Sequence, residues 1–247
     1  SAVILNISPR QMKAHAYPYI MAPMIKNLAE TVRVPVALNI DHGVNMEDIE
    51  TAIHCGYSSV MVDASSYELE ENIRRVRAVA ALAHDRGISV EAELGHVGVA
   101  ANADGQNEDY YTNVAQAEEF VKRTGCDCLA VAIGTAHGSY PKNMIPKLDF
   151  ERLRELKEKL NMPLVLHGGT GIPSDQIKKA IDLGVSKINV NTECQLAFAA
   201  ATRKYVEEGK DKQGKGFDPR KLLAPGVEAI KATVKEKMEL FGSVGKA

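Results

Sequence analysis

The sequence contains no tryptophan, only four cysteines and no long uninterrupted apolar run, and aromatic residues make up 5% of its 247 residues. Four scattered cysteines exclude a disulfide-dense secreted domain, and the closest pair, Cys126 and Cys128, lacks the spacing of a zinc ribbon. We therefore expect free thiols in a reducing, cytoplasmic compartment. Because no apolar run approaches about 18 residues, we expect no membrane-spanning helix.

Neither sign of charge is in clear excess. Lysine and arginine number 30 against 32 aspartates and glutamates, the net charge is −2, and no basic block is present. Nothing therefore favours a nucleic acid or an anionic membrane as a partner. The N-terminal residues do not show a signal-peptide pattern. A hydrophobic content of 45% suffices for one large core, so we expect a single domain over residues 1–247.

Short apolar runs alternate with longer amphipathic runs along the whole chain. Near-continuous apolar strands that alternate with helices are typical of a parallel sheet. The expected strands lie near Ala2–Ile7, Val34–Ile40, Ser59–Asp63, Ser89–Leu94, Asp127–Ile133, Pro163–His167 and Ser186–Val190. The expected helices lie near Pro18–Val32, Met46–Cys55, Glu68–Arg86, Val114–Thr124, Phe150–Leu160, Ser174–Leu183, Cys194–Glu208 and Pro225–Phe241.

This pattern gives seven strand–helix pairs and a final helix, whereas a closed (β/α)8 barrel has eight pairs. An open doubly wound sheet would explain seven strands, but such a sheet gathers its site at one switch point. Here polar residues follow the ends of almost every strand, which is typical of a barrel. We therefore predict an α/β fold, a (β/α)8 TIM barrel, whose N-terminal helix and first strand lie outside this sequence.

Titratable side chains stand at the C-terminal ends of the expected strands. The stretch ALNIDHG ends in Asp41 and His42, and SVEAELG carries Glu91 and Glu93 on one side of its strand. In a parallel barrel these ends meet on the face where active sites lie. Three imidazoles and several carboxylates there predict a catalytic metal site with three protein ligands and one open position. The candidates are Asp41, His42, Asp63, Glu91, Glu93, His137 and His167.

Each of these residues, taken alone, has a plainer explanation. A single histidine at a strand end is more often a hydrogen-bonded core or loop residue than a metal ligand. Asp41 or Asp63 could cap the helix that follows it. Glu91 and Glu93 could form an inward polar layer paired with a lysine or an arginine. The histidines that we expect at structural or exposed positions are His15, His54 and His84.

Two glycine- or asparagine-rich turns supply a second element of the expected site. HGGTG and NVNTE each lead from a strand toward a helix. Backbone N–H groups and the N-terminal dipole of a helix make such turns suitable for holding phosphate. In barrels this phosphate site commonly follows the seventh and eighth strands. If one strand precedes the sequence, the strands that lead into HGGTG and NVNTE are the seventh and the eighth.

A set of motifs in fixed order resembles the class II, metal-dependent fructose/tagatose-bisphosphate aldolase family. The motifs are DHG, VEAELG, AVAIGTAHGSY, VLHGGTGIP and KINVNTE, followed by the C-terminal segments FDPRK and AIKATVKEKMELFGS. The resemblance covers nearly the whole chain, and this motif set is highly specific. It implies that the chain is one class II aldolase barrel domain.

The resemblance also implies a cofactor and site residues. Asp41 matches the catalytic acid/base, and the implied zinc ligands are His42, His137 and His167. A second or displaced divalent ion is held in some members at the positions of Asp63 and Glu93, and a monovalent cation near the phosphate is a further family expectation. Arg220, in DPRK, matches an arginine that holds the far phosphate. The segments that bind dihydroxyacetone phosphate match Gly138, Gly168, Gly169, Thr170, Asn189, Val190, Asn191 and Thr192.

The implied reaction is the reversible cleavage of fructose 1,6-bisphosphate to dihydroxyacetone phosphate and glyceraldehyde 3-phosphate through a metal-stabilised enediolate. Zinc would act as a Lewis acid, so no Schiff-base lysine is needed, and we treat Lys187 as structural. Asp41 would take the proton of the C4 hydroxyl during cleavage. Because the family forms dimers and tetramers, a homodimer or homotetramer is implied.

One segment departs from the family pattern. The family usually reads ELG, then a Gly-Gly pair, then a Glu-Asp pair, whereas this chain reads ELGHVGVAANADGQNEDYYT. Val99 replaces the second glycine, and the pair Glu108–Asp109 is displaced. Glu108 is our candidate for the loop carboxylate that handles the C3 proton. The alternative is that Asn102–Asn107 is only a polar surface loop.

Other functions stay open at this point. The substrate could be tagatose 1,6-bisphosphate or a deoxy-ketogluconate phosphate. A non-catalytic companion subunit is a second possibility, although the intact set Asp41, His42, His137 and His167 argues against it. A metal-dependent barrel hydrolase is a third. Such an enzyme would carry an H-x-H pair on its first strand; this sequence has none, but the first strand is the one expected to lie outside it.

Overall fold

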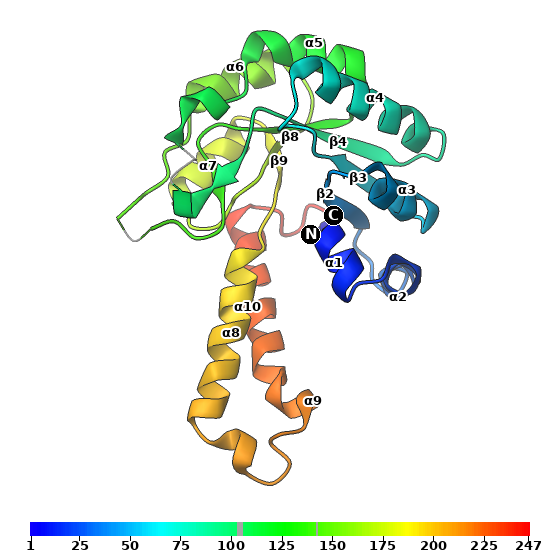
Figure 1. Ribbon diagram of the computed structural model, residues 1–247. Helices are drawn as coiled ribbons and strands as arrows, with labels where there is room; N and C mark the ends of the chain where they lie inside the picture. Colours follow the sequence, from blue (N-terminus) through cyan, green and yellow to red (C-terminus); the bar gives the residue numbers. More distant parts are fainter. Residues whose placement is uncertain (103–105, 142) are drawn as a thin grey trace.

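A seven-stranded parallel sheet forms the centre of the computed structural model, which describes residues 1–102, 106–141 and 143–247 (Figure 1). The strand order is β1-β2-β3-β4-β6-β8-β9, so each strand pairs with its neighbour in the chain once the short strands β5 and β7 are set aside. The seven strands are Val3–Ile7, Val36–Gly43, Ser59–Val62, Ser89–Leu94, Cys128–Val131, Leu164–Leu166 and Val185–Ile188. A separate parallel pair joins β5 (Gly98–Val99) to β7 (Ala136–His137).

Helices cover the convex face of this curled sheet, and α3, α4 and α7 contact its strands directly. Helices α1 to α7 span Pro9–Ala14, Pro18–Ala29, Met46–His54, Leu69–His84, Val114–Thr124, Phe150–Leu160 and Ser174–Asp182. Helices α8 to α10 span Thr192–Glu207, Pro219–Leu222 and Ala224–Leu240. Single turns of 3-10 helix span Ala100–Asn102, Glu108–Tyr110 and Lys210–Lys212.

Local capping explains why α5 and α6 begin and end at their predicted residues. The Asn113 side chain accepts hydrogen bonds from the first backbone N–H groups of α5, and Asp149 does the same for α6. At the other ends, Gly125 and Asn161 adopt left-handed backbone conformations with φ of 71° and 45°. A polar N-cap and a left-handed C-cap are both encoded within a few residues of the helix they terminate.

The two faces of the sheet have different characters because side chains alternate along each strand. Residues on the outer face join one extensive apolar core with the helices. A separate, small apolar cluster of Met61, Ala130 and Val165 lies on the inner face. Glu91 and Lys187 share that inner face through the strand register. The interior of the curl therefore carries charged groups, while the outer face supplies the core.

The observed sheet matches the expected α/β class and seven consecutive strands of a barrel. Strands β1 and β9 form its two ends, and they are not hydrogen-bonded to each other in the described residues. The short elements α1, α9, β5 and β7 were not predicted. None of them is long enough to produce a recognisable hydrophobic period.

Helices α8 and α10 run side by side as an arm that projects from the sheet, with α9 at its far end (Figure 1). The helices approach closely at Gly226 of α10, where a Cβ atom would lie 2.5 Å from the ring of Phe198. Within the described residues, none of the helices combines the length and the apolar character that crossing a membrane requires.

Candidate metal centre

Three histidines from separate strands meet at the C-terminal edge of the sheet. His42 lies near the end of β2, His137 ends β7 and His167 directly follows β8. The ring centroid of His42 is 4.6 Å from that of His167 and 4.8 Å from that of His137. One ring nitrogen from each of the three lies within 4.8 Å of the others. The structure thus gathers the three residues that the sequence suggested as ligands.

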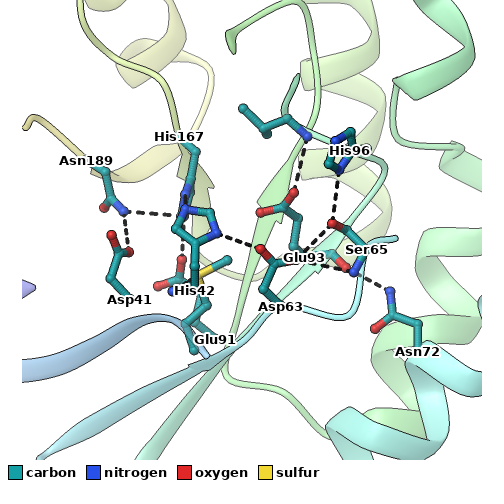
Figure 2. A network of polar contacts seen from close by, with 12 residues as sticks. Asp41, His42, Asp63, Ser65, Asn72, Glu91, Glu93, His96, His167 and Asn189 are labelled. Atoms are coloured by element: carbon teal, nitrogen blue, oxygen red, sulfur yellow. Dashed lines mark hydrogen bonds and ion pairs between the residues drawn. The ribbon is translucent and has the colours of Figure 1, made fainter. Parts of the chain in front are cut away.

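The backbone of β2 turns His42 toward this cluster. The pairing of β2 with β3 is irregular between Ile40 and Gly43, and His42 has a φ of 53°, a conformation uncommon for a residue with a side chain. Such irregularities redirect side chains at functional edges of sheets. As a result, Nδ1 of His42 lies 2.7 Å from Oδ2 of Asp63, the first residue after β3 (Figure 2).

His42 and His167 face each other between two carboxylates. Nε2 of His42 is 2.9 Å from Nδ1 of His167, and Nε2 of His167 is 2.8 Å from Oε1 of Glu91 (Figure 2). Ionised carboxylates only accept hydrogen bonds, so Asp63 and Glu91 draw the ring hydrogens to the outer nitrogens. The two inner nitrogens then present lone pairs to each other. A cation between them, either a proton or a metal ion, satisfies both.

The pKa values of the cluster agree with this arrangement. Burial alone would lower the pKa of His42, but its hydrogen bond to Asp63 and the charges of Asp41 and Glu93 raise it to about 9. Burial and the neighbouring imidazoles lower the pKa of His137 to about 3, so its ring is neutral and has one acceptor nitrogen. Without a metal the cluster therefore holds a proton on His42, at the position where a cation satisfies both inner nitrogens.

A second group of possible ligands adjoins the first and shares His42. It consists of His42, Asp63 and Glu93, again with ligand atoms within 4.8 Å of one another. Glu93 is buried, and its Oε2 has no hydrogen-bond partner in the described residues. Burial, together with the charge of Asp63, raises the pKa of Glu93 to about 7. A buried carboxylate oxygen without a partner is what a bound cation satisfies, so the donor set fits a metal in this group as well.

Asp41 directly precedes His42 on β2, and it is held by a residue that follows β9, the strand at the far end of the sheet order. Nδ2 of Asn189, the residue after β9, donates a hydrogen bond of 2.9 Å to Oδ1 of Asp41 (Figure 2). Oδ1 of Asn189 is buried and has no partner in the described residues. Asn189 thus fixes one oxygen of Asp41, and its own amide oxygen is left for another donor.

Comparison with known proteins identifies the family. The model of class II fructose-bisphosphate aldolases matches residues 1–246. This chain belongs to that family. It is 47% identical to the fructose-bisphosphate aldolase of Geobacillus stearothermophilus and 45% identical to the probable fructose-bisphosphate aldolase of Bacillus subtilis, and each match covers the whole chain and 85% of the relative. The crystal structure of the YdjI aldolase from Escherichia coli K12 superposes with a TM-score of 0.85 at 38% identity, over the whole chain and 84% of that protein.

Within this aldolase, the HGGTG turn needs glycine because other backbone segments lie against it. Gly168 has a φ of 67°, and a Cβ there would lie 2.4 Å from the carbonyl oxygen of Ala136. A Cβ on Gly169 would lie 2.9 Å from the carbonyl oxygen of Asn189. The turn therefore touches both β7 and the start of the NVNTE segment. The residues that the two turns and the β7 loop bring to this edge are Gly138, Gly168, Gly169, Thr170, Asn189, Val190, Asn191 and Thr192.

Two expected site residues lie apart from the histidines. Glu108 begins a turn of 3-10 helix and lines a cavity of about 400 Å³ together with Ser65, which donates a hydrogen bond of 2.8 Å to Asp63. It therefore stands beside the site but not in either metal group; residues 103–105 of the preceding loop lie outside the described residues. Arg220 is on α9 at the tip of the arm, where its side chain is 89% exposed and pairs with Asp218 at 2.6 Å.

The structure also reveals aldolase site contacts that the sequence did not specify. Nζ of Lys187 lies 2.5 Å from Oε2 of Glu91, so the expected inward polar layer exists at Glu91. His96 contacts Ser65 at 3.3 Å and so joins the network around Asp63 (Figure 2). The sequence indicated only a structural role for Lys187, and the strand register shows that it meets Glu91 on the inner face. The three histidines expected at exposed or structural positions, His15, His54 and His84, are exposed.

Proposed function

We propose that the protein is a zinc-dependent aldolase that reversibly cleaves fructose 1,6-bisphosphate to dihydroxyacetone phosphate and glyceraldehyde 3-phosphate. The observation that carries this proposal is the cluster of His42, His137 and His167 beside Asp41. Three imidazoles around an open position are typical of catalytic zinc. When bound, zinc would supply Lewis acidity toward the substrate carbonyl. A second divalent ion would be held by His42, Asp63 and Glu93.

Asp41 is the proposed acid/base. Its Oδ1 is fixed by Asn189, so the other oxygen can accept the proton of the C4 hydroxyl during cleavage and return it during condensation. Glu108 is the proposed carboxylate for the C3 proton, and its place in the cavity beside Ser65 supports this role. Neither role requires a lysine nucleophile, and Lys187 is already engaged by Glu91.

The proposed phosphate site of the dihydroxyacetone end is built from HGGTG and from residues 189–192. Helix α8 begins at Thr192, so its N-terminal dipole and its first backbone N–H groups point to this phosphate site. On the other side of His42, a cavity of about 610 Å³ is lined by Ser8, Arg10 and Lys13. Lys13 is paired there with Asp48 at 2.8 Å, and Arg10 is the second cationic side chain; its presence in the cavity supports a phosphorylated rather than a neutral sugar as substrate.

The test is a coupled cleavage assay with fructose 1,6-bisphosphate and tagatose 1,6-bisphosphate in parallel, before and after EDTA and zinc. We expect fructose 1,6-bisphosphate to be cleaved, EDTA to abolish cleavage and zinc to restore it. Asp41→Ala should lose several orders of magnitude in kcat while still binding one zinc ion. Cleavage that persists in EDTA, or zinc binding without cleavage of either sugar, would count against the proposal.

Two further properties are proposed with the activity. The arm carries exposed apolar side chains, including Leu196 (56% exposed) and Phe217 (68% exposed), which support a homodimer or homotetramer. Because α9 lies at the far end of the arm, Arg220 could reach a phosphate only in the site of another copy. Light scattering measures the oligomer directly. The four free cysteines support a cytoplasmic location.

A further inference from the structure

Glu91 lies behind the metal group, and both of its carboxylate oxygens are engaged. Oε1 is 2.8 Å from Nε2 of His167, and Oε2 is 2.5 Å from Nζ of Lys187. The residue is 1% exposed, so water does not compete for either contact. The ammonium group of Lys187 pairs with the carboxylate from one side and the His167 ring contacts it from the other, so Glu91 is an anion with two fixed partners.

These contacts determine which nitrogen of His167 carries its hydrogen. A neutral imidazole has one N–H donor and one acceptor, and a carboxylate can only accept. The hydrogen must then lie on Nε2, which leaves the lone pair of Nδ1 facing His42. The other donor near Nε2 is Nδ2 of Asn189, at 3.5 Å, and it already donates to Asp41 at 2.9 Å. Glu91 is thus the closer partner of Nε2: its Oε1 lies 2.8 Å from that nitrogen, whereas the amide nitrogen of Asn189 lies 3.5 Å away.

We propose that Glu91, held in place by Lys187, is a positioning residue that fixes His167 as the Nε2–H form and so presents Nδ1 to the metal. This inference rests on the proposed role of His167 as a zinc ligand. Carboxylates in this position orient a ligating histidine and increase its basicity, and their loss typically lowers metal affinity by about 10- to 100-fold. Lys187 contributes by fixing the direction of the carboxylate rather than by touching substrate.

The substitution Glu91→Gln gives a directional test because glutamine has one acceptor and one donor group. Lys187 can only donate, so it attracts the amide oxygen and turns the NH2 group toward His167. That arrangement favours a hydrogen on Nδ1, the nitrogen that the metal needs. We expect the dissociation constant for zinc, measured by chelator competition, to rise by about 10- to 100-fold. Nitrogen NMR of the metal-free protein should show the hydrogen of His167 moving from Nε2 to Nδ1.

The double substitution Glu91→Gln with Lys187→Met separates this role from general packing. Without Lys187, the amide oxygen is free to turn to His167 and accept from Nε2, so zinc affinity should recover part of the loss. A role in packing alone predicts further weakening instead. Cys128→Ala is the matched control, because Cys128 pairs with Glu91 in the strand register and lines the same interior. It should leave zinc affinity and the His167 form unchanged.

A measurement on the wild-type protein tests the proposed form of His167 even if the variants do not fold. Its metal-free nitrogen spectrum, with His167 assigned by the loss of its signals in His167→Asn, should show a hydrogen on Nε2. A hydrogen on Nδ1 would overturn the inference, and so would a folded Glu91→Gln protein with wild-type zinc affinity. Wild-type protein that binds no zinc would instead overturn the proposed function, whatever the form of His167.

Discussion

Asn189 and Asp41 are 148 residues apart in the chain, yet the amide of one fixes the carboxylate of the other at 2.9 Å. This bond joins the last strand of the sheet to the second and orients the proposed acid/base. We expect Asn189→Ala to lower kcat/KM by roughly 100-fold, because a misplaced catalytic group commonly costs about that factor. Zinc content should not change. Steady-state kinetics with metal analysis measures both, and Ser186→Ala, an exposed change on the same strand, is the control.

Removing the metal should lower stability as well as activity. A ligand at about 100 times its dissociation constant stabilises the folded state by about 2.7 kcal/mol. We therefore expect EDTA to lower the Tm of the wild-type protein and zinc to restore it. His137→Ala removes one of the three imidazoles and should show a much smaller response to zinc. Equal zinc-induced shifts in the two proteins would exclude His137 as a ligand.

Replacing Gly168 should lower the unfolding free energy for two separable reasons, its backbone conformation and the lack of space for a side chain. Its φ is 67°, and an added Cβ would lie 2.4 Å from the Ala136 carbonyl oxygen. Gly171 has a similar φ of 75°, but the nearest atom to an added Cβ is 3.4 Å away. We expect Gly171→Ala to cost about 1–2 kcal/mol of unfolding free energy, from backbone strain alone. Gly168→Ala should cost more, and it should also lower activity. Urea unfolding compares the two; equal losses would mean that the overlap with Ala136 is relieved.

Alkaline conditions should destabilise the protein partly through Cys126. Burial raises the pKa of this thiol to about 11, whereas an unfolded thiol titrates near 8.5. Between these values the unfolded state loses a proton that the folded state keeps. The stabilisation is therefore complete below about pH 8.5 and is lost as pH rises toward 11. Cys126→Ala should show a shallower loss of unfolding free energy between pH 8 and about 10.5 than the wild type. Parallel curves would assign the alkaline sensitivity to other groups.

Local signals in the sequence determined the longer elements and which residues of a strand share a face. The bounds of α5 and α6 follow from caps that lie next to them, Asn113 with Gly125 and Asp149 with Asn161. Strand alternation placed Glu91 and Glu93 on one face, and strand-end positions identified the three histidines before any contact was known. These properties depend on a few neighbouring residues, so they can be predicted from sequence.

Only the tertiary structure decided which of those residues meet. The contact between Lys187 and Glu91 spans 96 residues, and that between His167 and His42 spans 125. Both depend on strand register, and the second also depends on the irregularity of β2 at His42; no local pattern encodes either. The fold likewise set Glu108 in a neighbouring cavity and carried Arg220 to the tip of the arm. A motif can specify the ligand types of a metal centre, but the distances between its atoms are set by packing across the whole sheet.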